Sequence, residues 1–166
     1  MRKTPLLAIT ACCLTVCAVV VWAQGRKAGL WEITTTMTFQ QSPFPGGGAM
    51  PGMGAPRTTP ICVTQAQVDK YNGLPPQNQR GDCKMTDFNK TADGFTASMV
   101  CTGAMDGKGT VEGHYTADGH GHSKTHLIGT MHMGPNAAPF EMTAESDSVY
   151  KGADCGSVKP FVENVK

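Results

Sequence analysis

Apolar and polar residues alternate along most of the chain, first in a segment rich in β-branched residues. In the segment 30–39, one face collects Trp31, Ile33, Thr35, Met37 and Phe39, while Glu32, Thr34, Thr36 and Thr38 take the other. Successive side chains of a strand point to opposite faces, so this period of two predicts a half-buried β-strand. Related patterns predict further strands at 83–89, 95–102, 109–117, 124–133 and 140–150.

In the last three segments, alternation separates an apolar and glycine-containing face from a polar one. The first set is expected to face the core: Val111, Gly113, Tyr115, Thr125, Leu127, Gly129, Met131, Met133, Phe140, Met142, Ala144, Ser146 and Ser148. The second set is expected to face solvent: Thr110, Glu112, His114, Lys124, His126, Ile128, Thr130, His132, Glu141, Glu145 and Asp147.

Short turns separate these segments, which predicts sequential antiparallel strands in an up-and-down meander. The expected fold is mostly β, a curved sheet or partly closed barrel, in which closure would protect the strand edges. One short helix is expected over Thr64–Tyr71, because Thr64 and Gln67 have the spacing of a capping box. The segment 58–63 is a candidate edge strand, since Pro60 cannot donate a ladder hydrogen bond.

The segment 42–57 interrupts this pattern. Nine of its sixteen residues are Gly or Pro, and it also carries two methionines. Such a composition builds neither a ladder nor a core, so a flexible Gly/Pro/Met loop is predicted.

The first 23 residues have the layout of a secretory signal. Basic Arg2 and Lys3 precede an apolar stretch that runs to Trp22, and a small-x-small pattern predicts cleavage after Ala23. We therefore expect an exported protein with no membrane span after cleavage and a single domain over residues 24–166. Two alternatives stay open, namely an uncleaved anchor and lipid attachment at Cys12.

Four cysteines remain after the predicted cleavage, which suits two disulfides in an oxidising compartment. A turn centred on Ala92 would place Asn89 opposite Phe95 and Cys83 opposite Cys101, leaving Cys62 for Cys155. The competing scheme joins Cys62 to Cys83 and Cys101 to Cys155, and a register slip of one residue would favour it. No CxxC-like pair is present among the four, which argues against a tetrathiolate zinc site and thioredoxin-type chemistry.

The distribution of charged residues argues against nucleic acid as a partner. Once the signal is removed, 12 of the 14 Lys and Arg remain against 13 Asp and Glu, and the two signs are interspersed. Nucleic-acid binding by phosphate neutralisation needs a basic stripe, which this sequence does not contain.

All five histidines fall between residues 114 and 132. If Gly119–Gly121 form a hairpin turn, His114 and His126 face each other on the polar side, and His120 and His122 form a weaker pair at the loop tip. His132 lies six residues further along, about 20 Å at strand rise, so it cannot join the same site. These two pairs are the candidate metal ligands, for copper, nickel or zinc. The alternative is that the histidines are ordinary polar surface residues, because no fourth ligand or supporting group is evident.

Methionine offers a second metal hypothesis. Met50 and Met53 in the loop, with Met131 and Met133 beside His132, could present thioethers to copper(I). Alternation, however, directs Met131 and Met133 inward and His132 outward. Methionine as an adaptable filler of the core is therefore the favoured interpretation.

The sequence contains few groups of residues that could catalyse a reaction. Glu112 and His114 share a strand face and could form an acid–base pair, and Ser123 lies near the hairpin turn. The sequence has no nucleophile elbow, no HExxH motif and no phosphate-binding glycine loop before a helix. We therefore expect no enzymatic activity and no obligatory cofactor.

A curved meander also has a concave face. The inward side chains that would line it are Trp31, Ile33, Met37, Phe39, Phe95, Met99, Leu127 and Met131. They could enclose a small apolar ligand, or pack against each other, since a domain of this size needs most of them for its own core.

Four short motifs extend over nearly the whole mature chain: Gly29-Leu30-Trp31-Glu32, Cys62-Val63-Thr64, the run from Cys83 to Phe88, and Gly152-x-Asp154-Cys155. Over roughly residues 28–156, this pattern resembles the small exported bacterial family catalogued as domain of unknown function 3617. The resemblance implies a periplasmic, β-rich domain with four cysteines, and it indicates no reaction. The histidine cluster is not part of the family pattern, so the resemblance says nothing about it.

The expected role is therefore that of a periplasmic, non-enzymatic domain that binds a ligand or supports the envelope. Metal binding through surface His and Met, and transport of a small apolar ligand in the concave sheet, are the two specific alternatives.

Overall fold

The structure is a computed structural model that describes residues 27–44, 54–71, 73, 82–133 and 136–160. This part of the chain forms seven strands and one helix, listed here in chain order: β1 (Gly29–Gln41), β2 (Arg57–Val63), α1 (Gln65–Tyr71), β3 (Asp82–Lys90), β4 (Gly94–Thr102), β5 (Met105–Tyr115), β6 (His120–Met133) and β7 (Asn136–Gly152). The predicted signal, its cleavage site and residues 45–53 of the predicted loop lie outside the described residues. Arg57, assigned to that loop, already belongs to β2.

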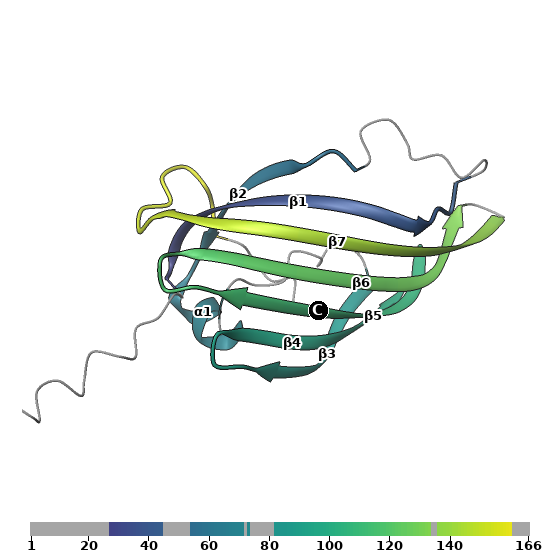
Figure 1. The fold of residues 1–166 in the computed structure, drawn as a ribbon, viewed down its shortest axis with the longest axis horizontal. Helices are drawn as coiled ribbons and strands as arrows, with labels where there is room; N and C mark the ends of the chain where they lie inside the picture. Colours follow the sequence, from purple (N-terminus) through teal and green to yellow (C-terminus); the bar gives the residue numbers. More distant parts are fainter. Residues whose placement is uncertain (1–26, 45–53, 72, 74–81, 134–135, 161–166) are drawn as a thin grey trace, which may run out of the picture.

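The strands form one antiparallel sheet in the order β2-β1-β7-β6-β5-β4-β3 (Figure 1). Strands β3 to β7 are the predicted meander, and β1 then adds to β7, the last strand in the chain. The sheet is curved but not closed into a barrel, because β2 and β3 remain at opposite edges. The mostly β prediction is confirmed, and so is the edge position of β2, which contains Pro60. No helix within the described ranges has the length and apolarity needed to span a membrane.

The short helix connects the two edges of the sheet at one end. It directly follows β2, yet the Tyr71 ring lies 5.9 Å from the ring of Phe88 on β3, centroid to centroid. Lys90, also on β3, donates from Nζ to the carbonyl oxygen of Asp69 at 2.5 Å. Figure 1 places α1 at the end of the sheet that carries the β5–β6 turn. The helix therefore covers one end of the concave face.

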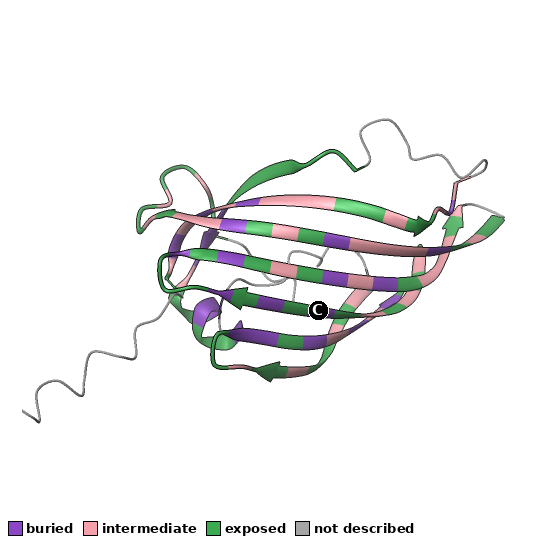
Figure 2. Ribbon diagram, in the orientation of Figure 1, coloured by how far each residue is buried: buried purple, intermediate pink, exposed green. Residues whose placement is uncertain are grey.

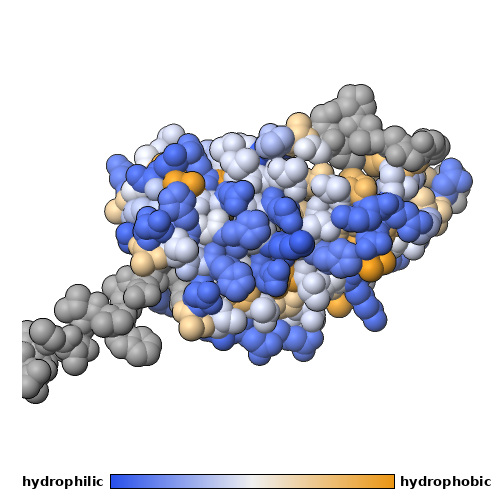
Figure 3. Space-filling model, in the orientation of Figure 1, coloured by the Kyte–Doolittle hydropathy of each residue, from blue (hydrophilic) through white to orange (hydrophobic). Residues whose placement is uncertain are grey.

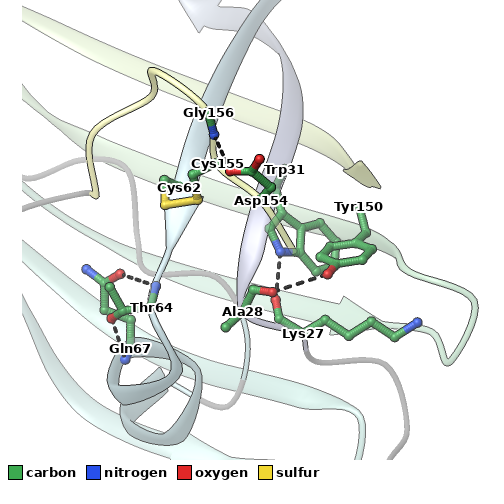
Figure 4. The surroundings of a disulfide bond; sticks show 10 residues. All are labelled: Lys27, Ala28, Trp31, Cys62, Thr64, Gln67, Tyr150, Asp154, Cys155 and Gly156. Atoms are coloured by element: carbon green, nitrogen blue, oxygen red, sulfur yellow. Dashed lines mark hydrogen bonds between the residues drawn. A yellow bond between two sulfur atoms is a disulfide. The ribbon is translucent and has the colours of Figure 1, made fainter. Parts of the chain in front are cut away.

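The predicted capping box is present at the start of this helix (Figure 4). The backbone N–H of Thr64 donates to Gln67 Oε1 at 3.0 Å, and the N–H of Gln67 donates to Thr64 Oγ1 at 3.3 Å. Two backbone donors that the first turn leaves unpaired are thus satisfied reciprocally. Thr64 is the capping residue, so the helix itself begins at Gln65.

The core lies against the concave face, where the inward rows of the sheet meet α1 (Figure 2). Trp31 is 1% exposed and makes edge contacts with the rings of Tyr115 and Tyr150, at 6.4 Å and 5.3 Å between centroids. Its indole Nε1 donates to the carbonyl oxygen of Lys27 at 2.9 Å (Figure 4). A buried tryptophan needs such a partner, because an unsatisfied indole N–H would be costly in the core.

Inward-facing glycines make room for these aromatic rings. A Cβ added at Gly113 would lie 2.7 Å from Cε1 of Phe95, and one added at Gly121 would lie 2.5 Å from Cδ1 of Tyr115. Gly113 and Gly121 therefore leave the space that the rings of Phe95 and Tyr115 occupy.

Both favoured disulfides are confirmed. Cys83 lies opposite Cys101 in the β3–β4 ladder and is bonded to it. Cys62, at the end of β2, is bonded to Cys155 beyond β7, with 5.5 Å between the Cα atoms (Figure 4). The predicted pairing of Asn89 with Phe95 is wrong by one residue, because the ladder shifts between Thr86 and Asn89. Asp87, inside this irregularity, has a left-handed φ of 50°.

Candidate functional site

The convex face of the sheet carries the histidines, among threonines, carboxylates and lysines. Figure 3, in the orientation of Figure 1, shows mostly hydrophilic side chains over the sheet. The exposed hydrophobic exception on this face is Ile128, which is 52% exposed. The predicted division of β5, β6 and β7 into inward and outward faces is thus confirmed.

The predicted pair of His114 and His126 is wrong, because the hairpin turns two residues earlier than expected. Thr116 N–H donates to the carbonyl oxygen of His120 at 2.9 Å, and Gly119 takes a left-handed φ of 91° inside this turn. His114 consequently lies opposite His122, and His126 lies opposite Thr110. His120 and His122 are not at a loop tip either, since both already belong to β6.

His114 and His122 are direct neighbours across β5 and β6, and each ring is held by a carboxylate. Nδ1 of His114 lies 3.2 Å from Asp93 Oδ2, and Nδ1 of His122 lies 2.9 Å from Asp147 Oδ1. The carboxylates come from the outer neighbours, the β3–β4 turn and β7. The resulting row across the sheet is Asp93, His114, His122 and Asp147. The two imidazoles stand side by side at its centre.

Two further histidines also contact carboxylates, but through the other ring nitrogen. Nε2 of His126 lies 2.9 Å from Glu141 Oε1, and Nε2 of His132 lies 2.8 Å from Asp106 Oδ2. His120 lies opposite Val149 of β7. None of these three has another histidine opposite it in the ladders described.

Hydrogen bonds lower the pKa of several of these carboxyl groups. The His114 ring holds the pKa of Asp93 below its usual value, chiefly by hydrogen bonding. The pKa of Asp106 is lowered by the His132 ring and then by the backbone N–H of Gly103, which donates to it at 2.9 Å. In the turn, the hydroxyl of Thr116 lowers the pKa of Asp118. A hydrogen bond to the ionised form favours that form, so all three groups stay charged at neutral pH.

Substitution of His132 by alanine is expected to raise the pKa of Asp106 towards its usual value. The shift will be partial, since the Gly103 bond remains. Because the folded-state pKa of Asp106 is depressed, its contribution to stability is present above the unfolded pKa of about 3.9 and is lost as pH falls through the folded pKa. Carboxyl NMR titration of Asp106 measures the shift, with His126→Ala as the matched control. An unchanged pKa in His132→Ala would contradict the assigned cause.

No group of three or more His, Cys, Asp or Glu side chains within the described residues is arranged to hold a metal ion. The four predicted ligands therefore do not form one closed site. Met131 and Met133 lie on the inward face and His132 on the outward one, as alternation predicted. Met50 and Met53 lie outside the described residues.

The residues predicted to act as an acid–base pair do not contact each other in the structure. Glu112 lies opposite Lys124 in the ladder, and the ring of His114 bonds to Asp93 rather than to Glu112. Ser123 lies opposite Gly113, on the inward face, so it cannot act together with His114 on the outward face.

The concave face has a packed end and an open end. Five of the eight predicted lining residues are buried: Trp31, Ile33, Phe95, Met99 and Leu127. The other three are more accessible, since Phe39 and Met131 are partly buried and Met37 is 41% exposed. Met105 and Met142 are partly buried beside them, and all five lie towards the end of the sheet away from α1. The apolar face is therefore tightly packed near the helix. Towards the far end several of its side chains keep part of their surface exposed, although Phe140 between Met142 and Met131 is fully buried.

The sequence pattern of one family, described as protein of unknown function DUF3617, matches residues 26–155. The chain belongs to this DUF3617 family. No curated protein and no solved structure matches it. Family membership confirms the resemblance seen in the motifs, and it assigns no reaction to this DUF3617 domain.

Sequence reasoning missed the carboxylates that hold the histidines of the DUF3617 domain. Alternation did place Asp147 and Glu141 on the polar face, and a meander makes β7 the neighbour of β6. The contacts could have been found by combining these two signals. Asp93 gave no such signal, because it precedes β4 in a turn.

Proposed function

We propose that this DUF3617 domain is exported to the periplasm and binds a small apolar ligand at the open end of its concave face, without catalysing a reaction. One observation carries the proposal, namely the partly exposed apolar cluster formed by Met37, Phe39, Met105, Met131 and Met142, which we call the methionine rim.

Export is supported by the basic and apolar layout of the first 23 residues and by the two disulfides. Disulfides persist in oxidising compartments and are rare in the cytosol. Neither bond has the CxxC spacing of a redox catalyst, so both are best understood as structural.

The methionine rim suits an apolar ligand because of where it lies and what it contains. Phe140, in the row between Met142 and Met131, is fully buried, so the core of the domain extends between these two rim residues. Four rim side chains, those of Phe39, Met105, Met131 and Met142, pack against this core and keep part of their surface exposed, and Met37 is 41% exposed. Clustered exposed apolar surface often marks a binding site, and unbranched methionine side chains adapt their shape to different ligands.

The packed end of the concave face does not suit a ligand. Trp31, Tyr115 and Phe95 are each at most 7% exposed, and the rings of Phe95 and Tyr115 fill the space beside Gly113 and Gly121. A ligand carried inside the sheet would therefore have to bind at the methionine rim.

A charge placed on the methionine rim should abolish binding of an apolar probe. Met131→Lys is expected to weaken binding of a fluorescent fatty-acid analogue at least tenfold, because the ammonium group would have to be desolvated beside the ligand. Ile128→Lys is the matched control, since Ile128 is on the same strand but on the convex face. Met131→Gln, an uncharged variant of similar size, separates the effect of the charge from that of the altered side chain. Thermal unfolding of each variant checks that it is folded.

Equal probe binding by Met131→Lys and the unsubstituted protein would overturn the proposal. Native mass spectrometry of the protein isolated from its own periplasm gives an independent result. A bound apolar molecule of defined mass, lost in Met131→Lys, is expected.

A further inference from the structure

We propose that His114 and His122 form a two-histidine site for a borderline divalent metal ion, copper(II), nickel(II) or zinc, on the convex face. This site is independent of the methionine rim, which lies on the opposite face of the sheet. It also differs from the histidine pairs that the sequence suggested, because the ladder register brings together a different couple.

The first support is the position of the two side chains. They lie directly opposite each other on adjacent antiparallel strands. Residues in such positions have Cβ atoms about 4.5–5.5 Å apart, so both imidazoles can reach one ion without a change of backbone. Both side chains are about half exposed, 55% for His114 and 52% for His122, which leaves them accessible to an ion from solution.

The second support is the hydrogen bonding of the rings. An ionised carboxylate can only accept, so the contacts with Asp93 and Asp147 place the proton of each neutral ring on Nδ1. The lone pair is then on Nε2, and no described residue occupies that atom in either ring. Histidine ligands of metal ions are commonly held this way, with a carboxylate that fixes the tautomer and raises the basicity of the ligating nitrogen.

The other histidines of the convex face show that this arrangement is not general. His126 and His132 direct Nε2 to their carboxylates, which is the opposite choice of ring nitrogen. Their ladder partners on β5 and β7 are Thr110, Thr143 and Ala137, none of which is a strong metal ligand. His114 and His122 alone combine a facing imidazole with two available Nε2 atoms among the ladders described.

The charges around the pair favour a cation. Asp93 and Asp147 flank the two rings and place two negative charges beside the ion. Lys124, two residues along β6 from His122, is neutralised by Glu145 at 3.2 Å, and Glu112 lies opposite it. With only two protein ligands, the remaining positions are filled by water or an exogenous ligand. Such an open site exchanges its metal readily, unlike a closed structural zinc site with four protein ligands.

The site is tested by titrating copper(II) or zinc(II) into the purified protein without a polyhistidine tag. Isothermal titration gives the stoichiometry and Kd, and paramagnetic broadening by copper(II) identifies the rings that bind. We expect one ion per chain, with His114→Ala and His122→Ala each weakening binding at least tenfold. Because both rings ligate one ion, the double variant should lose little more than either single variant. Asp147→Ala should weaken binding about tenfold by releasing the ring of His122.

His126→Ala and His132→Ala are the matched controls, since each removes a carboxylate-bound histidine from the same face. Both should bind as the unsubstituted protein does. Retention of binding in the double variant would overturn the proposal. An equal loss in His120→Ala, with His114→Ala unaffected, would also overturn it in favour of a chelate formed by His120 and His122. No binding above that of a variant lacking all five histidines would show that the pair is only polar surface.

Discussion

Substitution of Phe140 by alanine is expected to lower the free energy of unfolding by about 3–5 kcal/mol. Phe140 is 0% exposed and lies on β7, in the middle of the sheet. Its neighbour on β6 is Gly129, which in turn lies opposite Gly107 of β5. Neither glycine has a side chain that could move into the space left by the ring. The cavity would therefore persist, and persistent cavities account for the upper part of this range.

Urea unfolding measures this loss. The slope of the unfolding free energy against urea concentration should not change if only the folded state is affected. Ile128→Ala is the control, because it removes a large apolar side chain from the exposed face of β6. Its effect should stay within about 0.5 kcal/mol, as is usual for surface positions. A loss of less than about 1 kcal/mol in Phe140→Ala would mean that the surrounding side chains collapse into the cavity, which the two glycines next to it in the ladder argue against.

The strands and their faces could be predicted because they depend on a local property. Alternation with a period of two assigns each side chain to a face wherever one face is buried, and β5, β6 and β7 follow it closely. The capping box is equally local, since Thr64 and Gln67 are three residues apart. The two disulfides followed from the register of a single short hairpin, with the second bond assigned by elimination.

The histidine pair could not be predicted correctly, because register depends on the turn. A glycine at either 119 or 121 can take the left-handed position, and choosing the wrong one changes the partner of every residue in the hairpin. The structure selects Gly119, where an added Cβ would lie 2.9 Å from Cβ of Tyr150 on β7. Packing against a strand about 30 residues later in the chain is not visible in the local sequence.

The arrangement of strands that are distant in the sequence could not be predicted from the alternation either. The pairing of β1 with β7 joins the two ends of the domain, and alternation does not specify which strand lies beside which. The same holds for α1, whose contact with Phe88 and Lys90 connects opposite edges of the sheet. The methionine rim depends on this organisation, because its side chains come from β1, β5, β6 and β7.

Removal of the Cys62–Cys155 bond is expected to destabilise the protein more than removal of the Cys83–Cys101 bond. The first bond closes a loop with a sequence separation of 93, and the second closes one of 18. In the chain-entropy description, loops of these sizes restrict the unfolded chain by about 4.7 and about 3 kcal/mol respectively. The shorter loop is also closed by the β3–β4 ladder itself, whereas β2 is an edge strand held by its ladder with β1 and by a single bridge from Cys62 to Pro160.

The measurement compares two double variants in urea, Cys62→Ala with Cys155→Ala and Cys83→Ala with Cys101→Ala. Alanine avoids both an unpaired thiol and a buried hydroxyl, since Cys62 and Cys101 are 6% and 2% exposed. A larger loss from the 83–101 variant would contradict the loop argument and indicate that this bond supports the core directly. The expected order instead makes Cys62–Cys155 the bond that fixes the edge strand, and with it the start of α1, to the end of β7. Its loss should therefore loosen the packed end of the concave face, while the histidines of the convex face keep their register in the β5–β6 hairpin.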